Sequence, residues 1–226
     1  PSIKIAEMSK FLENIYRSIN IALINELKIA TTKLDIDIYD VIKIASTKPF
    51  GFQKFFPGPG TGGHCIPIDP IYFSWLSKKK GVNVKFIELS SKINQIRTKW
   101  IIKKLKTIAK KISSPKILLL GLSYKKNIED TRESASIKIL EDLLKQKYAI
   151  DYSDPFNQKI VLNYRKKRKV LFSKKFSKNV VKKYNLIIIA TDHDKFDYSL
   201  LKSSKKTIVD LRGKFKNIKS RYIYQL

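Results

Sequence analysis

Apolar residues recur at three- and four-residue steps through the first half of the chain, the spacing typical of amphipathic helices. The pattern predicts long helices over residues 4–34 and 85–112, a shorter helix over 36–47 with Asp35 as its N-cap, and a short helix over 71–81. We therefore expect an all-helical N-terminal domain. The positions expected on the buried sides of the two long helices are Met8, Phe11, Leu12, Ile15, Ile19, Ala22, Leu23, Leu27 and Ala30, and Ile93, Ile96, Trp100, Leu105, Ile108 and Ile112.

The pattern changes at Lys116, where short apolar runs begin to alternate with helical segments. Such alternation predicts an α/β domain with a doubly wound parallel sheet. We place the boundary near residue 114, so that residues 1–114 form the helical domain and 115–226 the α/β domain. The expected strands are 116–121, 149–155, 169–172, 186–191 and 207–212, and the expected helices are 133–147, 157–163 and 176–184.

The stretch FFPGPGTGGHCIPIDP, residues 55–70, interrupts the helical pattern. It holds four of the eight glycines, four of the eight prolines and the only cysteine, Cys65. Glycine and proline at this density predict a rigid loop in place of a helix or a central strand, with backbone that can approach a ligand closely. A lone thiol in such a loop is a candidate nucleophile, although a free cysteine is more often packed as a small apolar side chain.

One cysteine cannot form an internal disulfide, which fits a reducing cytoplasmic setting. No apolar run is long enough to cross a bilayer, so we expect no membrane contact. The formal net charge is +28, and all but seven of the 47 basic residues are lysines spread over every segment. This spread favours solvated faces over a dedicated nucleic-acid surface, yet a basic nucleic-acid-binding protein, with Arg165–Lys169 as its densest cluster, remains an alternative.

Polar residues follow the predicted strands at their carboxyl ends, where parallel sheets bind ligands. These residues are Ser123, Tyr124 and Lys125, Asp154, Thr191, Asp192 and His193, and Asp210 and Arg212. Each could be a simple turn residue, but together they predict a polar rim. On the first helix, Lys10 and Asn14 lie one turn apart and point the same way. Spacing alone favours a solvated lysine there.

Five stretches, taken in order, resemble the UDP-sugar 6-dehydrogenases, which oxidise UDP-glucose or UDP-N-acetylhexosamines to uronic acids. The stretches are AEMSKFLENIYRSINIALINEL, FFPGPGTGGHCIPIDP, GLSYKKNIEDTRES, ATDHDKF and DLRG, and they cover nearly the whole chain. The resemblance implies a central helical dimerisation domain followed by a Rossmann-like UDP-binding domain. No G-x-G-x-x-G follows a strand, so we expect a fragment that lacks the family's N-terminal NAD-binding domain and is inactive alone.

The resemblance also implies catalytic roles. Cys65 matches the family nucleophile, which captures the aldehyde formed by the first oxidation as a thiohemiacetal and releases the acid through a thioester. Lys10 and Asn14 match the pair that stabilises the developing oxyanion. Asp69 matches the carboxylate that orders Lys10 and assists water in the hydrolysis. His64 and His193 are expected to be structural.

The binding residues are implied in the same way. The backbone of Lys54, Phe55, Phe56, Pro57, Gly58 and Gly62 corresponds to positions that line the sugar nucleotide. Lys125 and Arg212 match cations beside the UDP-sugar, and Arg132 matches a contact to the phosphates of the cofactor, NAD. No metal is implied, and the expected partner is a second copy through the central helices.

The identity of the sugar stays open at this stage. Ile68 stands directly before the loop aspartate, where many UDP-glucose enzymes have lysine. The sequence GGHCIPIDP is more similar to that of the UDP-N-acetylhexosamine members. The predicted substrate is therefore UDP-N-acetylglucosamine, with UDP-glucose as the alternative.

Overall fold

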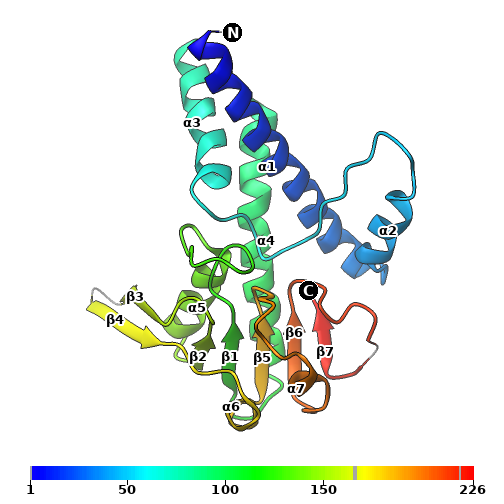
Figure 1. Cartoon of the computed structure of the whole chain (residues 1–226), viewed down its shortest axis with the longest axis vertical. Coiled ribbons are helices and arrows are strands. Elements are labelled where there is room, and N and C mark those ends of the chain that lie inside the picture. Colours follow the sequence, from blue (N-terminus) through cyan, green and yellow to red (C-terminus); the bar gives the residue numbers. More distant parts are fainter. Residues whose placement is uncertain (1, 165–166, 219) are drawn as a thin grey trace.

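The computed structural model describes residues 2–164, 167–218 and 220–226 and shows a helical part standing on a sheet (Figure 1). The first half contains α1 (Ile3–Lys33), α2 (Ile38–Ala45), α3 (Cys65–Lys79) and α4 (Lys85–Ala109). The second half contains β1 (Lys116–Leu120), α5 (Ala135–Lys145), β2 (Ala149–Ser153), β3 (Lys159–Tyr164), β4 (Lys167–Phe172), α6 (Lys178–Lys182), β5 (Leu186–Ile189), α7 (Ser199–Lys202), β6 (Thr207–Asp210) and β7 (Ile223–Gln225). The predicted fold class, helical domain and parallel α/β domain, is confirmed.

The main sheet is parallel throughout and has the strand order β2-β1-β5-β6-β7. The strand order reverses between β1 and β5. The loops that follow these two strands therefore leave the same edge of the sheet in opposite directions. One face of the sheet packs on α5 and on the second half of α4, and the other face packs on residues of α6 and α7. Because α4 begins among the other helices and ends in the core of the sheet, it is the element that joins the two parts (Figure 1).

The start of α3 corrects the prediction for the glycine- and proline-rich stretch. We expected a loop through residue 70, but the helix begins at Cys65 and includes Pro67 and Pro70. The four glycines all precede Cys65. A proline in the first turn of a helix costs no hydrogen bond, since the N–H groups there have no helical partner. Pro67 lies in that turn, so the helix can begin before it.

The helix expected over 157–163 is wrong, because residues 159–164 form β3. Side chains alternate along this strand, with Ile160 and Leu162 buried and Val161 exposed between them. This period of two residues is that of a strand with one covered face. β3 pairs with β4 in an antiparallel hairpin, with Lys159 opposite Phe172. Of the basic cluster, Arg165 and Lys166 lie outside the described residues, and Lys167–Lys169 belong to β4.

Three smaller features also differ from the prediction. The N-cap of α2 is Asp37, whose side chain accepts the Tyr39 N–H at 2.8 Å, whereas Asp35 has a φ of 55° in the preceding turn. The strand β7 and the short helix α7 were not predicted. They are too short for an apolar period to be read from the sequence.

The apolar residues of α1 divide between two faces. Ile15 and Ala22 are buried, but Leu12, Leu23 and Leu27 are 62%, 50% and 41% exposed. Ile96 of α4 was also expected to be buried and is 54% exposed. The described helices pack against only one side of α1, so the prediction of a single buried face was wrong. None of the described helices combines the length and apolar character needed to cross a membrane.

Gly121, which ends β1, allows a tight crossing of two chain segments. Its φ is +81°, and a Cβ there would lie 2.4 Å from the carbonyl oxygen of Thr191. Gly51 has a similar φ of +77°, but nothing lies within 4 Å of its Cβ position. A substitution would therefore strain the backbone at both positions, but only at 121 would the new Cβ also meet a neighbouring segment.

We predict that Gly121→Ala lowers the free energy of unfolding by about 3 kcal/mol, and Gly51→Ala by only about 1 kcal/mol. Urea denaturation of both variants measures the difference. Equal losses would show that backbone strain, and not the contact with Thr191, makes glycine necessary at 121.

Candidate functional site

Cys65 lies at the point where the glycine-rich loop becomes α3. It is the first residue of that helix, and its thiol is exposed and free. Gly60 and Gly63, with φ values of +150° and +87°, bend the chain just before it. The N-terminus of a helix carries unpaired N–H groups and favours negative charge, which suits an anionic sulfur.

Asn14 and Asp69 connect α1 to α3 beside the cysteine. The Asn14 amide is buried and donates to the Asp69 carboxylate, with Nδ2 and Oδ2 2.6 Å apart. Lys10 instead pairs with Glu13 at 2.9 Å on the exposed side of α1. The carboxylate that orders Lys10 in this structure is therefore Glu13, whereas Asp69 was expected.

Two cations lie within electrostatic reach of the thiol. Glu13 is the main cause of a raised pKa for Lys10, and Cys65 adds a smaller contribution in the same direction. Arg132 forms hydrogen bonds of 2.7–3.1 Å with Asp130, which raises the pKa of Arg132, and Cys65 again adds a smaller contribution. Both cations are on the surface, where water screens their interactions with Glu13, Asp130 and the thiol. We therefore expect these ion pairs to contribute little to the free energy of unfolding.

A buried polar cluster, Asn25, Asn94, Arg97 and Thr98, holds the loop against α1 and α4. Asn25 Oδ1 accepts the Gly58 N–H at 3.0 Å, and Arg97 Nε donates to the Gly58 carbonyl at 3.1 Å. Thr98 Oγ1 donates to the Pro59 carbonyl at 2.7 Å, and Asn94 Oδ1 accepts from Asn25 Nδ2 at 3.0 Å. The backbone of Gly58 is thus fully paired within the protein.

Sequence reasoning missed this cluster. Asn25, Asn94 and Arg97 lie on helix faces that also bury other polar residues, such as Ser18 and Ser90, so the apolar period did not single them out. Arg97 is fully buried, and its burial lowers the pKa to about 10, so the side chain stays charged at neutral pH. Among the described residues neither terminal guanidinium nitrogen of Arg97 has a hydrogen-bond partner, and the same is true of the Tyr39 hydroxyl.

Arg212 holds the other side of the loop from the end of β6. Its Nε donates to the Ala190 carbonyl at 2.8 Å and its Nη2 to the Tyr124 carbonyl at 3.2 Å. A Cβ on Gly58 would lie 2.9 Å from Arg212 Nη1, so glycine at 58 leaves room for the guanidinium to pack against the loop backbone. Burial lowers the pKa of Arg212, and nearby Asp192 opposes that effect.

Tyr124 packs on the last two glycines of the loop. A Cβ on Gly62 would lie 2.5 Å from Tyr124 Cβ, and one on Gly63 would lie 2.9 Å from Tyr124 Cζ. The Gly63 N–H also donates to the Arg132 carbonyl at 2.8 Å. The immediate structural reason for glycine at 62 and 63 is therefore close contact with the 122–134 loop of the α/β domain.

The remaining predicted binding residues lie on the outer side of the same loops. Lys54 and Lys125 are exposed. Phe56 is 51% exposed, and its ring stacks on that of Tyr39 with the ring centroids 6.3 Å apart. Phe55 is half-buried, and Pro57 is buried. No backbone hydrogen bond occupies the amides of residues 54–56 among the described residues, in contrast to the paired amide of Gly58.

A cavity of about 650 Å³ opens between α3, α4 and α5. Ile66, Ile102 and Lys99 are among its lining residues. None of the predicted catalytic or binding residues lines it, so it is not part of the candidate site. Within the described ranges, no group of three or more His, Cys, Asp or Glu residues could hold a metal ion.

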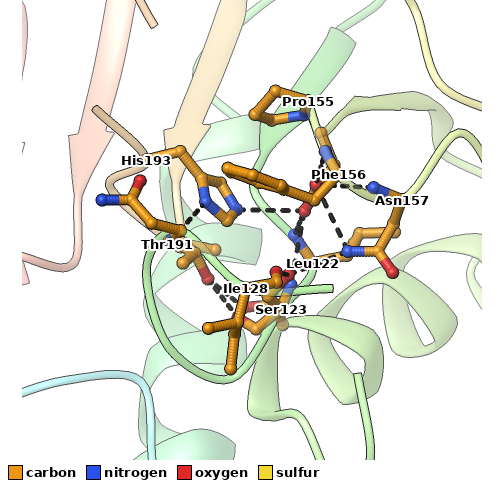
Figure 2. Close-up of polar contacts among 12 residues, drawn as sticks. Leu122, Ser123, Ile128, Pro155, Phe156, Asn157, Thr191 and His193 are labelled. Carbon is orange, nitrogen blue, oxygen red and sulfur yellow. Dashed lines mark hydrogen bonds and ion pairs between the residues drawn. The ribbon is translucent and has the colours of Figure 1, made fainter. Parts of the chain in front are cut away.

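Asp154, directly after β2, is the centre of a polar network with residues that follow β1 and β5; Figure 2 labels its partners Leu122, Phe156, Asn157 and His193. Its carboxylate accepts the N–H groups of Leu122 at 2.7 Å, Phe156 at 2.8 Å and Asn157 at 2.9 Å. His193 Nε2 lies 3.1 Å from it, and both side chains are completely buried. The expectation that His193 is structural agrees with this position.

The pKa of Asp154 reports how well the network satisfies the carboxylate. Burial by itself raises the pKa, but the hydrogen bonds from His193, Leu122 and Phe156 more than offset it and lower the pKa to about 2. The charged form is therefore favoured in the folded state, relative to the ordinary value of 3.8.

Both family models that match the chain belong to one family. The central domain of the UDP-glucose/GDP-mannose dehydrogenase family matches residues 4–96, and the UDP-binding domain of the same family matches residues 118–217. The chain belongs to the UDP-glucose/GDP-mannose dehydrogenase family. The resemblance predicted from the sequence is thereby confirmed at the level of the family.

Individual members of the UDP-glucose/GDP-mannose dehydrogenase family are similar over most of the chain. The UDP-N-acetyl-D-mannosamine dehydrogenase of Methanococcus vannielii is 36% identical over 94% of this chain and 46% of its own length. The UDP-N-acetyl-D-glucosamine 6-dehydrogenase of Pseudomonas aeruginosa is 35% identical over 69% of this chain and 37% of its own length. The chain spans about half the length of the first of these family members and about a third of the second.

Solved structures of the family agree with the fold. A UDP-N-acetyl-mannosamine dehydrogenase from Staphylococcus aureus superposes with a TM-score of 0.76 at 31% identity, over 99% of this chain and 51% of that one. A UDP-D-ManNAc dehydrogenase from Pyrococcus horikoshii gives 0.77 at 29% identity, over 97% and 51%.

We predict that Asp154 makes stability depend on acidic pH. Its folded pKa is depressed, so the stabilisation is complete above pH 3.8 and is lost as the pH falls through 2. The loss is on the order of 2 kcal/mol. Urea denaturation between pH 5 and 2 should show a shallower pH dependence in Asp154→Asn than in the parent. Asp35→Asn is the control, and an unchanged slope in Asp154→Asn would contradict the assignment.

Proposed function

We propose that the chain forms the catalytic and UDP-binding parts of a nucleotide-sugar 6-dehydrogenase, which converts the C6 alcohol of a UDP-N-acetylhexosamine to a carboxylate. The observation that carries this proposal is the set of groups around one exposed thiol: buried Asn14 donates to Asp69, one helical turn beyond Cys65, and Lys10 and Arg132 are both within electrostatic reach of the thiol. Family membership supports the reaction class.

Cys65 supplies the nucleophile in this proposal. The thiolate attacks the C6 aldehyde and forms a C–S bond, giving a thiohemiacetal that cannot escape between the two oxidations. Oxidation of this adduct gives a thioester, and water then breaks the C–S bond to release the uronate and regenerate the thiol. When bound, the nicotinamide cofactor that the family implies would supply the hydride acceptor for both oxidations, and Arg132 is the residue of this chain that would contact it.

Three side chains act on the oxygens of the reacting carbon. Lys10 and Asn14 would stabilise the negative charge that develops on the C6 oxygen, as a cation and an amide donor can. Asp69, held by Asn14, would orient the hydrolytic water. Glu13 holds the Lys10 ammonium in an exposed ion pair, so substrate must draw the ammonium away from Glu13, at small cost because the pair is exposed.

The nucleotide is assigned to the surface where the two domains meet. The free amides of residues 54–56 and the cations Lys125 and Arg212 are suited to a diphosphate. For the cofactor, Arg132 is the residue of this chain that fits a phosphate contact, since it is exposed and close to Cys65. The N–H groups of Leu122 and Ser123, where a Rossmann-like domain often holds a dinucleotide, are already bonded to Asp154.

Among substrates, the sequence alone placed UDP-N-acetylglucosamine first. The relatives include both UDP-N-acetylmannosamine and UDP-N-acetylglucosamine enzymes. The mannosamine enzyme matches a larger share of this chain, at a slightly higher identity. We therefore propose a UDP-N-acetylhexosamine and place the mannosamine epimer first. Its uronic acid would serve as a precursor of surface polysaccharide, made in the cytoplasm.

The chain joined to the NAD-binding domain of a relative tests the reaction. We predict two NADH per molecule of UDP-N-acetylmannosamine, less turnover with UDP-N-acetylglucosamine, and least with UDP-glucose. Cys65→Ser should reduce uronate formation by about 1,000-fold or more, because no thioester can form. Thr107→Ala, which removes an exposed hydroxyl on α4, is the control. Completion of both oxidations by Cys65→Ser would contradict the role of the nucleophile.

We also propose that a second copy of the chain covers the outer face of α1. Leu12, Leu23 and Leu27 form an apolar stripe on this helix that the described residues leave exposed, and stripes of this kind mark protein interfaces. Leu23→Glu combined with Leu27→Glu should convert a dimer to a monomer in light scattering. Lys43→Glu on α2 is the control, and a monomeric parent chain would contradict the proposal.

A further inference from the structure

The loop between β1 and α5 carries the exposed cations Lys125 and Arg132, and several hydrogen bonds fix the position of this loop. The side chain of Lys125 is exposed and has no hydrogen-bond partner among the described residues. The residues around it are anchored. Thr191 Oγ1 donates to the Ser123 carbonyl at 2.5 Å, and Ser123 Oγ donates to the Ile128 carbonyl at 2.6 Å.

The Lys126 side chain pairs with Asp194 at 3.3 Å, but the first backbone hydrogen bond after Lys125 is made to His193. The Asn127 N–H donates to His193 Nδ1 at 2.9 Å. A backbone N–H can only donate, so Nδ1 is an acceptor and the ring proton lies on Nε2. Nε2 in turn donates to Asp154, 3.1 Å away (Figure 2). Both ring nitrogens are therefore used, and the neutral imidazole is held in one tautomer.

Asp154 is fixed independently of the histidine, because its carboxylate also accepts backbone N–H groups from Leu122, Phe156 and Asn157. The imidazole thus transmits the position of a rigid carboxylate to Asn127. Asn127 has a φ of 62°, and its side chain exchanges hydrogen bonds with Asp194 at 2.6 Å and 3.0 Å. This second contact should keep the loop folded when the histidine bond is lost.

We propose that His193, oriented by Asp154, is a positioning residue that holds Lys125 where it reaches the diphosphate of the nucleotide. The inference rests on the proposed function, because it needs Lys125 to bind the ligand. The buried His193 bonds the backbone of Asn127, two residues after Lys125, and so fixes the backbone from which the exposed Lys125 side chain extends. Lys125 then pays less conformational entropy when it binds an anion.

Titration calorimetry with UDP tests the coupling in a double-mutant cycle. We expect His193→Ala to raise the Kd about tenfold, in line with the loss of one buried hydrogen bond to the loop. We expect the Lys125→Ala/His193→Ala double variant to bind like Lys125→Ala alone, because the histidine acts through the lysine. A double variant that is a further tenfold weaker than Lys125→Ala would overturn the proposal.

A matched control separates positioning from general stability. Tyr184→Phe removes a 2.9 Å hydrogen bond to Asp151 on the same sheet, away from the loop. It should lower the midpoint of urea denaturation without changing the Kd for UDP. His193→Gln, which keeps a polar side chain that can reach one of the two partners, should recover part of the affinity lost in His193→Ala.

Hydrogen exchange of the free chain decides the inference without any ligand. In His193→Ala, amides of residues 124–131 should exchange at least tenfold faster than in the parent, while those of β1 and β5 keep their protection. Unchanged protection of the loop would overturn the positioning role. A parent chain that binds no UDP but shows the faster exchange in His193→Ala would instead contradict the proposed function and leave the role of the histidine in the loop intact.

Discussion

The hydrogen bonds to both sides of the Gly58 peptide are the contacts on which the arrangement of the site depends. Asn25 and Arg97 take up the N–H and the carbonyl from the helical side, and Arg212 passes over the α-carbon from the sheet side. The loop is therefore held between the two domains by contacts that leave no room for a side chain. Because Cys65 follows seven residues later, these contacts determine where α3 begins and where the thiol lies.

The helical side of this arrangement contains a buried charge. Arg97 has no exposed surface, and an uncompensated buried cation is costly, so its Gly58 bond and its place near the Trp100 ring, 5.0 Å from the centroid, matter for stability. Lys28 is also nearly buried, and burial followed by repulsion from Arg97 lowers the pKa of Lys28. Positive charge is thus concentrated behind the loop, which adds to its attraction for a phosphate-containing ligand.

Most of the architecture could be predicted from periodicity, and the exceptions have physical causes. The long helices α1 and α4 and the buried strands β1 and β5 follow from strong apolar periods. The hairpin β3–β4 was mistaken in part for a helix because six residues rarely separate a period of two from one of 3.6. The start of α3 was missed because proline was taken as a helix breaker, although Pro67 lies in the first turn, where it costs little, and the helix also continues through Pro70. Exposure of Leu12 and Leu23 could not be predicted, since periodicity shows which residues share a face but not what covers it.

The candidate site divides in a similar way. Cys65, Asn14 and Asp69 could be named from their motifs, and the structure joins Asn14 to Asp69 by a hydrogen bond. The partner of Lys10 could not, because Glu13 competes for it at short range on the same helix. Asn25 and Arg97 carry no motif, and their contacts with Gly58 span 33 and 39 residues of sequence, so only the fold shows them.

The Asp154 carboxylate has one more consequence for this sheet. In a nucleotide-binding α/β domain, the amides that follow the first strand and the start of the next helix usually receive a phosphate. Here Asp154 bonds the amides of Leu122 and Ser123, and the Ser134 hydroxyl accepts the amide of Ser136 at the start of α5. The protein's own oxygen atoms therefore occupy N–H groups that could otherwise bind an anion. A phosphate bound at this edge would therefore have to contact rim side chains such as Lys125, because these backbone amides are already paired.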